Sequence, residues 1–422
     1  MYISSWVWET YALVMRKRTP TVVLAPDSFK GSLSAVDVAA AMAAGVRVAL
    51  GADVRVALGA DVRIVQCPLA DGGEGTLQTF LSAGNAEPRV IHAHDALGRE
   101  RTARYGLSND GRVAIIEAAE ANGLPHVADV PPAPLRADTF GVGEIAVSAL
   151  EDGVDEILLC IGGSATTDGG TGMLRALGVR FLDADGRDVA PGGAGLGDIA
   201  AVDESQLHPR ARSVRWRVAT DVDNPLCGEN GAAAVFGPQK GATADQVRQL
   251  DSGLKQLAIA LRTAYGADVL TLRGAGAAGG MAACLSAILG AELVPGSDLV
   301  SETVGLRSLC ADADLVITGE GAFDAQSLQG KVVQGVVRQT PPECPVVVIA
   351  GTVRLSAAEI RAARISAAFS IARGPAELHE LLDNTAELLR EATAQVVGLI
   401  DSQWSRPAST PTHSRATADC PS

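Results

Sequence analysis

The sequence predicts an α/β protein with two domains built on mainly parallel sheets. Short β-branched runs alternate with alanine-rich helical stretches along the 422 residues, a length that suits two or three domains. The runs are continuously apolar, which is typical of strands that are buried on both faces of a parallel sheet. Nearly every glycine-rich or acidic motif directly follows one of these runs. Because ligands bind at the carboxyl ends of strands in such sheets, this layout also predicts where a site lies.

The individual elements follow from local pattern. A helix is predicted from Ala35 to Leu50, because Ser34 and Asp37 have the spacing of a capping box with Asp in place of Glu. Apolar, β-branched runs predict the strands Val22–Ala25, Val62–Cys67, Val113–Ile116, Ile157–Ile161, Trp216–Ala219, Leu315–Thr318 and Val346–Ala350.

Composition excludes several classes of function. The net charge of −14 opposes binding to nucleic acid or to an anionic membrane, although a local site can still attract a small anion. The sequence contains no run of about 18 apolar residues that could span a membrane. The seven cysteines are widely spaced and lack a C-x-x-C motif, so we expect neither zinc nor a disulfide framework. We therefore expect a cytoplasmic protein.

Three segments depart from the α/β pattern. Residues 1–20 place aromatic residues before a basic cluster, the reverse of a secretory signal, so we expect a disordered extension or a true start at Met15. Residues 402–422 are rich in Ser, Thr and Pro and are expected to be a disordered tail. The octapeptide VRVALGAD at 46–53 is repeated at 54–61. We interpret the second copy as an insertion in a surface connection, with a longer helix or an added edge strand as alternatives.

Two loops near the N-terminus have the residues of an anion site. The stretch APDSFKGS from Ala25 places a lysine and hydroxyls between a strand and a helix, where free backbone N–H groups attract anions. The stretch DGGEGT from Asp71 combines glycines, which let backbone approach phosphate, with two carboxylates that could hold Mg²⁺. An ordinary capped turn and a simple glycine turn are the alternatives.

Three later loops carry more carboxylates. The stretch GGSATTDGGTG from Gly162 suits an oxyanion, with Asp168 as base or metal ligand. Asp221 and Asp223 would lie on the same side of an extended chain and share a hard cation, unless they form an Asx-turn. The stretch TGEGAFDAQSLQGK from Thr318 supplies two carboxylates and Lys331, or else only a capped helix start.

A sixth motif points to a different function. Residues 274–279 match G-x-G-x-x-G and follow the apolar run Val269–Leu272, as in a dinucleotide site. However, a second strand ending in an acidic residue about 20 residues later is missing from the sequence. We interpret this stretch as close helix packing or as one more backbone contact to phosphate. The six histidines fall outside all of these loops, which argues against His-based catalysis.

Taken together and in order, the motifs resemble the bacterial type I glycerate kinase family. The matching stretches are APDSFKGSLSA from Ala25, PLADGGEGT from Pro68, IGGSATTDGGTGM from Ile161, ATDVDNPLCGENGAA from Ala219 and ITGEGAFDAQSLQGK from Ile317. The resemblance covers about Thr21 to Ala394, and the extension, the repeat and the tail leave every motif intact.

The resemblance implies a phosphotransferase that converts (R)-glycerate and ATP to phosphoglycerate and ADP with Mg²⁺, with 2-phosphoglycerate favoured. It also implies a flavodoxin-like domain made of residues 21–90 and 290–400, with a second α/β domain inserted at 91–289. The expected partners are glycerate and ATP, with a homodimer as one candidate assembly. An NAD-linked oxidoreductase using the loop at 274–279, or a non-catalytic phosphometabolite-binding protein, are the competing functions.

Phosphoryl transfer needs charge neutralisation, in-line positioning and a proton acceptor, and these needs suggest roles. Lys30 and Lys331 would neutralise anions. Asp168 is the first candidate for the base and Asp324 is the second. The metal ligands are expected among Asp71, Glu74, Glu320, Asp221 and Asp223. The residues expected to bind substrate or phosphate are Asp27, Ser28, Lys30, Gly72, Gly73, Gly162, Gly163, Ser164, Thr166, Thr167, Gly169 and Lys331. We expect all these loops to converge on one cleft.

Overall fold

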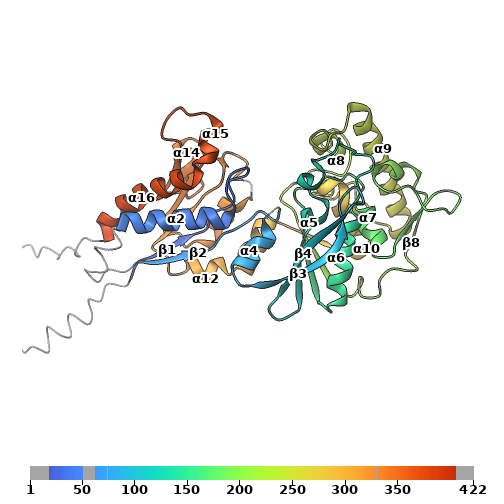
Figure 1. The fold of residues 1–422 in the computed structure, drawn as a ribbon, viewed down its shortest axis with the longest axis horizontal. Coiled ribbons are helices and arrows are strands. Elements are labelled where there is room, and N and C mark those ends of the chain that lie inside the picture. The colour runs from blue at the N-terminus through green and yellow to red at the C-terminus, as the bar shows by residue number, and fades with distance from the viewer. Residues whose placement is uncertain (1–18, 51–61, 74, 329, 405–422) are drawn as a thin grey trace, which may run out of the picture.

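A computed structural model describes residues 19–50, 62–73, 75–328 and 330–404. The second octapeptide copy, residues 1–18 of the predicted extension and residues 405–422 of the tail lie outside the described residues. The described chain forms a five-stranded sheet, a six-stranded sheet and two small two-stranded sheets (Figure 1). The predicted α/β fold with mainly parallel sheets is confirmed.

The five-stranded sheet is entirely parallel and has the flavodoxin-like strand order 2-1-3-4-5. Its strands, in spatial order, are β2 (Arg63–Gln66), β1 (Thr21–Leu24), β11 (Leu315–Thr318), β13 (Val346–Ala350) and β15 (Ala367–Ser370). The chain adds β2 on one side of β1 and the later strands on the other side, beginning with β11. Ligands bind in such folds at this switch point between β1 and β11. The two ends of the described chain thus build one sheet.

Helices cover both faces of this sheet. On one face, α2 (Ala35–Leu50) packs against α16 (Thr385–Trp404), so closely that a Cβ on Gly45 would lie 2.3 Å from the carbonyl oxygen of Arg390. Figure 1 shows both helices on the same side, with α12 on the other side. The helices of the second face are α4 (Thr76–Ser82), α11 (Gly296–Thr303), α12 (Leu306–Cys310) and α13 (Val332–Gln339).

The six-stranded sheet mixes a parallel core with an antiparallel hairpin. In spatial order its strands are β10 (Glu292–Val294), β9 (Arg215–Ala219), β6 (Glu156–Cys160), β5 (Val113–Glu117), β4 (Glu100–Ser108) and β3 (Ala86–His94). One large core, with the buried Trp216 in it, joins this sheet to its helices. Those helices are α5 (Ala119–Asn122), α6 (Phe140–Glu151), α7 (Thr171–Ala176), α8 (Ala232–Phe236), α9 (Ala244–Tyr265) and α10 (Met281–Leu289).

The two sheets share a core through α4, which lies between them in Figure 1. Leu77 and Phe80 of α4 belong to the same buried cluster as Leu158 of the six-stranded sheet and Val23 of the five-stranded sheet. The expected boundaries at 90/91 and 289/290 would cut β3 and assign β10 to the wrong sheet. We therefore propose that the inserted domain runs from about residue 85 to about residue 295.

The remaining elements are short. They are β7 (Arg180–Leu182), β8 (Ala201–Asp203), β12 (Ala322–Phe323), β14 (Thr352–Val353), α14 (Ala357–Ala362), α15 (Leu378–Asp383) and the 3₁₀ turns Leu124–Val127, Gly193–Asp198, Pro238–Lys240 and Ala277–Gly280. Among the described helices, none is both long enough and apolar enough to cross a membrane.

The structure contradicts the dinucleotide interpretation of residues 274–279. The preceding run Val269–Leu272 forms turns instead of a strand, so the strand–glycine–helix geometry of that fingerprint is lacking. The glycines serve packing instead. A Cβ on Gly279 would lie 2.2 Å from the carbonyl oxygen of Thr166, which shows how closely this stretch approaches the loop that follows β6.

Candidate functional site

Two cavities meet where the carboxyl ends of the two sheets face each other. The first has a volume of about 400 Å³ and the second about 300 Å³, and Lys30 and Asp71 line both. Loops after β1, β2, β11 and β13 line the first cavity, while loops after β2, β6 and β9 line the second. Three of the five predicted loops therefore contribute most of their predicted residues to one continuous site. The loop after β6 contributes only Gly162, Gly163 and Ser164, and the loop after β9 contributes Asp221 but not Asp223.

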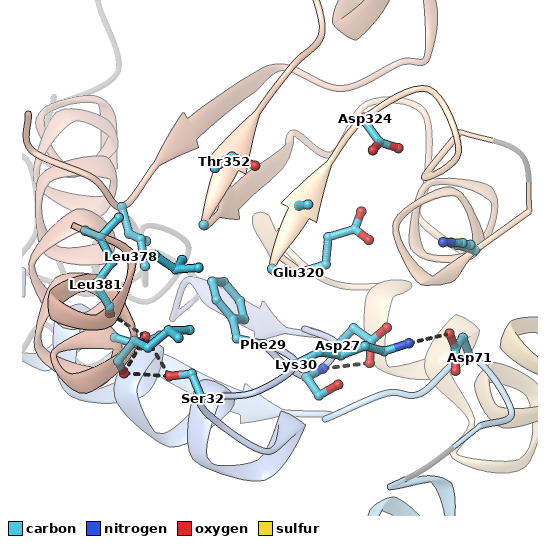
Figure 2. A pocket seen from close by; sticks show the side chains of 18 of the residues that line it. Asp27, Phe29, Lys30, Ser32, Asp71, Glu320, Asp324, Thr352, Leu378 and Leu381 are labelled. Atoms are coloured by element: carbon cyan, nitrogen blue, oxygen red, sulfur yellow. Dashed lines mark hydrogen bonds and ion pairs between the residues drawn. The ribbon is translucent and has the colours of Figure 1, made fainter. Parts of the chain in front are cut away.

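The loop after β1 is held on both sides. The backbone N–H of Asp27 donates to the carbonyl of Gly319 at 2.8 Å, which ties this loop to the loop after β11. The Ser32 hydroxyl donates to the Leu382 carbonyl at 2.8 Å and lies 2.7 Å from the Thr385 hydroxyl (Figure 2). Between these anchors the Lys30 side chain is 79% exposed, with its Nζ 3.7 Å from Oδ2 of Asp71. Lys30 is therefore an exposed cation at the junction of the cavities, with Asp71 as its ion-pair partner.

Asp27 is the most unusual carboxyl of the first cavity. Its side chain is buried, and burial together with the nearby Asp71 charge raises the pKa of Asp27 to about 7. A hydrogen bond from the Ser28 N–H and the Lys30 charge act in the opposite direction. A carboxylate with this pKa can accept a proton near neutral pH, which an ordinary aspartate does poorly.

The loop after β2 is shaped by close backbone contact. Gly72 has φ +81° and lies against Gly296, so a Cβ there would be 2.7 Å from the Gly296 Cα. Glu117 on β5 fixes the other end of the loop, because its carboxylate accepts the Gly75 N–H at 3.0 Å and the Leu77 N–H at 3.1 Å. Asp71 and Gly73 consequently face the cavities, while the predicted metal ligand Glu74 lies outside the described residues.

The loop after β6 lines the second cavity with its first residues only. Gly162, Gly163 and Ser164 are at the cavity wall. Thr166, Thr167 and Gly169 are buried behind that wall, where the Gly169 N–H donates to the Gly279 carbonyl at 3.0 Å. For these three residues the structure indicates support of the loop in place of the predicted phosphate contact.

The structure also contradicts the predicted role of Asp168 as base. The side chain is fully buried and lies outside the described linings of both cavities. Oδ2 accepts the Thr139 N–H at 3.0 Å, the Thr139 hydroxyl at 2.7 Å and the Gly172 N–H at 3.1 Å, and Oδ1 accepts the Gly170 N–H at 3.1 Å. Both carboxylate oxygens of Asp168 therefore accept hydrogen bonds from the chain itself, and these bonds stabilise the start of α7.

Lys240 is the site residue that sequence reasoning missed. Its side chain is buried at the second cavity, with Nζ 3.0 Å from the Ser164 hydroxyl and 2.6 Å from the Thr166 carbonyl. Burial lowers the pKa of Lys240 to about 8, although the Asp168 charge opposes this shift. The only signal in the sequence was a lysine in the glycine-flanked stretch GPQKG, which follows a helix and therefore lay outside the strand-end pattern.

The loop after β9 separates two carboxylates that were expected to act together. Asp221 lines the second cavity, and its Oδ1 accepts the Gly296 N–H at 2.8 Å. Burial, with the Asp71 charge, raises the pKa of Asp221 to about 7. Asp223 is 75% exposed and forms an ion pair with Arg273 at 2.6 Å. The structure therefore does not bring Asp221 and Asp223 together as a cation site, because Asp223 pairs with Arg273 and is absent from the described linings of both cavities.

The loop after β11 contributes Glu320, Asp324 and Lys331 to the first cavity, as predicted (Figure 2). Glu320 is largely buried, and this burial raises the pKa of its carboxyl. Asp324 has one oxygen engaged, since Oδ1 accepts the Gln326 N–H at 2.9 Å. Lys331 follows Gly330, whose φ of +101° turns the chain into α13.

Fold and site together define an α/β protein with a cleft that carboxylates and lysines line at the carboxyl ends of its strands. A family model described as the glycerate kinase family matches residues 22–401. A glycerate kinase of Halalkalibacterium halodurans is 42% identical over 92% of this chain and 99% of its own length. A glycerate 2-kinase of Escherichia coli is 40% identical over 90% of this chain and 97% of its own length. The chain belongs to the glycerate kinase family.

A solved structure gives the same result for the fold. The crystal structure of a candidate glycerate kinase 2 from Salmonella typhimurium superposes with a TM-score of 0.78 at 40% identity, covering 92% of this chain and 99% of that one. The family expected from the ordered motifs is confirmed.

Proposed function

We propose that this enzyme transfers the γ-phosphoryl group of ATP to (R)-glycerate at the junction of the two cavities. The observation that carries the proposal is that Lys30 and Asp71 line both cavities at once. Two substrates bound in adjoining cavities would have their reacting groups at this junction, which is the arrangement that phosphoryl transfer needs. Membership of the glycerate kinase family and the names of the relatives support glycerate as the acceptor.

Asp27 is the proton acceptor that the geometry supports best. Asp168 is a poorer candidate, because backbone donors occupy its carboxylate. Asp324 is also a poorer candidate, because one of its oxygens already accepts a hydrogen bond. A pKa of about 7 lets the Asp27 carboxylate take the proton of a substrate hydroxyl as the phosphoryl group transfers. An Asp27→Asn variant that keeps the wild-type kcat would show that Asp27 is not the proton acceptor.

Charge neutralisation is assigned to three lysines. Lys30 stands at the junction, Lys331 lines the first cavity and Lys240 lines the second. Lys30 and Lys331 would stabilise the negative charge that the transferring phosphoryl group spreads over its oxygens, and Lys240 would pair with the carboxylate of glycerate in the second cavity. Gly162 and Gly163 add a bare backbone wall on the side of the second cavity.

The carboxylates around the junction fit Mg²⁺ bound together with phosphate oxygens. Within the described residues, no group of three or more His, Cys, Asp or Glu residues forms a complete metal site. However, Oδ2 of Asp221 and Oε1 of Glu320 are buried and lack a hydrogen-bond partner among the described residues. Mg²⁺ commonly takes one or two protein carboxylates and completes its shell with phosphate and water. One or two of Asp71, Glu320 and Asp221 would hold the ion, which would neutralise phosphate charge.

The product we favour is 2-phosphoglycerate, because one relative is named a glycerate 2-kinase. We also propose the cytoplasm as the place of reaction, since ATP is the donor and the cysteines of the described chain are free thiols. Against a non-catalytic binding protein, the buried Asp27 with its raised pKa gives the site a group that can accept a proton.

The function is tested by ADP release from purified protein with ATP, Mg²⁺ and a panel of hydroxy acids. We expect turnover with (R)-glycerate at a kcat/KM at least about 10-fold above lactate and glycolate, because the names of the relatives support glycerate as the acceptor and each of the other two acids lacks one of its hydroxyl groups. Folded protein that releases no ADP above background with glycerate would contradict the proposal. Turnover that requires a nicotinamide cofactor would favour the oxidoreductase.

The pH dependence should show the titration of Lys240. Its pKa of about 8 in the folded protein lies below the usual 10.5, so the cation at the second cavity is lost as the pH rises through 8. We expect the KM for glycerate to increase at least about 10-fold from pH 7 to pH 9.5, while the KM for ATP changes little. A Lys240→Arg variant that folds should lose this increase, because arginine stays charged. A glycerate KM that is flat over this range would contradict the assignment.

A further inference from the structure

The first cavity is divided into a charged end and an apolar end. In Figure 2, Glu320, Lys30 and Asp71 lie at one end, and Phe29 separates them from Leu378 and Leu381 at the other. Ile371 and Leu382 complete the apolar end. A volume of about 400 Å³ is within the range of sites that enclose a drug-sized ligand, and the apolar end adds the kind of surface that a nucleotide base needs.

The apolar end carries an exposed leucine that the packing of the chain does not explain. The short helix α15 has no buried residue among the described ones, and Leu378 at its start is 69% exposed although it lines the cavity. The Ser32 hydrogen bonds to Leu382 and Thr385 hold the loop after β1 against the start of α16. The loop that carries Phe29 is thus tied to Leu382, so this part of the cavity is formed before a ligand binds.

The second cavity is smaller, at about 300 Å³, and its lining mixes apolar side chains such as Leu124 and Phe236 with polar ones. Among the polar groups are the Ser164 hydroxyl, the buried Lys240 ammonium and the Asp221 carboxylate. A cation with a hydroxyl beside it suits a carboxylate, and a carboxylate nearby suits hydroxyl donors. These are the functional groups of a small hydroxy acid.

We propose that the apolar end of the first cavity binds the adenine base of ATP, with Phe29 and Leu378 against the ring. The triphosphate then extends past Lys331 toward Lys30, and glycerate occupies the second cavity with its carboxylate at Ser164 and Lys240. The site of the base lies beside the switch point between β1 and β11, where doubly wound sheets bind nucleotides. This inference rests on the proposed function and adds to it the orientation of both substrates.

The test is direct binding of ADP and of inorganic tripolyphosphate by calorimetry, with the full chain and Mg²⁺. Leu378→Asp places a charge in the proposed base site at an exposed position, so it should not disturb folding. Leu399→Asp is the matched control, because Leu399 is 71% exposed on α16 and lies outside the described lining of the cavity. We expect Leu378→Asp to weaken ADP binding at least about 10-fold while tripolyphosphate binding and the KM for glycerate stay within about twofold. Leu399→Asp should match the wild type in every measurement.

Two results would overturn the orientation. One is a Leu378→Asp protein that binds ADP as tightly as Leu399→Asp does. The other is a Leu378→Asp protein whose glycerate KM rises while its ADP affinity is unchanged, which would place glycerate in the first cavity. Failure of the proposed function itself looks different, because wild-type protein would then bind neither ADP nor tripolyphosphate.

Discussion

Replacing Lys30 with alanine should reduce kcat at least about 100-fold and leave the fold intact. Lys30 is the cation that lines both cavities, so it lies closest to the phosphoryl group in transit under the proposed function. Removing one preorganised group that stabilises transition-state charge typically costs 10²- to 10³-fold in rate, about what we expect here. Stability should hardly change, because the side chain is 79% exposed and its ion pair with Asp71 is long at 3.7 Å.

The measurement is steady-state ADP release together with the melting temperature. Lys255→Ala is the matched control, since Lys255 is also exposed and paired with an aspartate, but lies outside the described linings of both cavities. We expect both variants to melt within about 2 °C of the wild type and only Lys30→Ala to lose activity. Equal rates for the two variants would show that Lys30 has no part in catalysis.

Asp168→Asn should act mainly on stability. The asparagine has the same shape, but its NH₂ group must point at backbone N–H donors that the carboxylate now accepts, those of Thr139 and Gly172 or that of Gly170. Hydrogen bonds to a buried charged group contribute about 1.5–3 kcal/mol each, so losing the one from Gly170, the smaller loss of the two orientations, costs at least about 1.5 kcal/mol. For a domain of this size that corresponds to a fall in melting temperature of at least about 3 °C.

The control for this prediction is Asp223→Asn, because Asp223 is 75% exposed and should tolerate the change. Activity of Asp168→Asn should fall with the loss of folded protein and with the displacement of Gly162–Ser164. An inactive variant with the melting temperature of the wild type would instead restore Asp168 as a catalytic residue.

The sequence predicted the parts of the fold that carry a strong local signal. The runs at β1, β11 and β13 are short, apolar and β-branched, and they form the centre of the five-stranded sheet. The hairpin of β3 and β4 was missed, because charged residues and a proline interrupt both the apolar run and the alternation that would mark it. Tertiary pairing with β5 makes these residues strands, and this contact is invisible locally.

The candidate site was predictable as a set of loops but not as a set of side chains. Strand-end loops of parallel sheets converge for topological reasons, so Lys30, Asp71, Glu320 and Ser164 could be expected to meet. Sequence does not show which way a side chain points within a glycine-rich loop, and Asp168 points into the protein. Lys240 reaches the site from a helix-to-helix connection, which no strand-end argument covers.

The most direct test of the proposed reaction is the identity of its product. Wild-type protein incubated with ATP, Mg²⁺ and (R)-glycerate should yield ADP and phosphoglycerate in equal amounts, and phosphorus–proton NMR should show the phosphate coupled to the proton on C2. Coupling to the C3 protons would still show a glycerate kinase, but one that phosphorylates the 3-hydroxyl. ATP left intact by folded protein, or ADP and free phosphate without phosphoglycerate, would contradict phosphoryl transfer to glycerate.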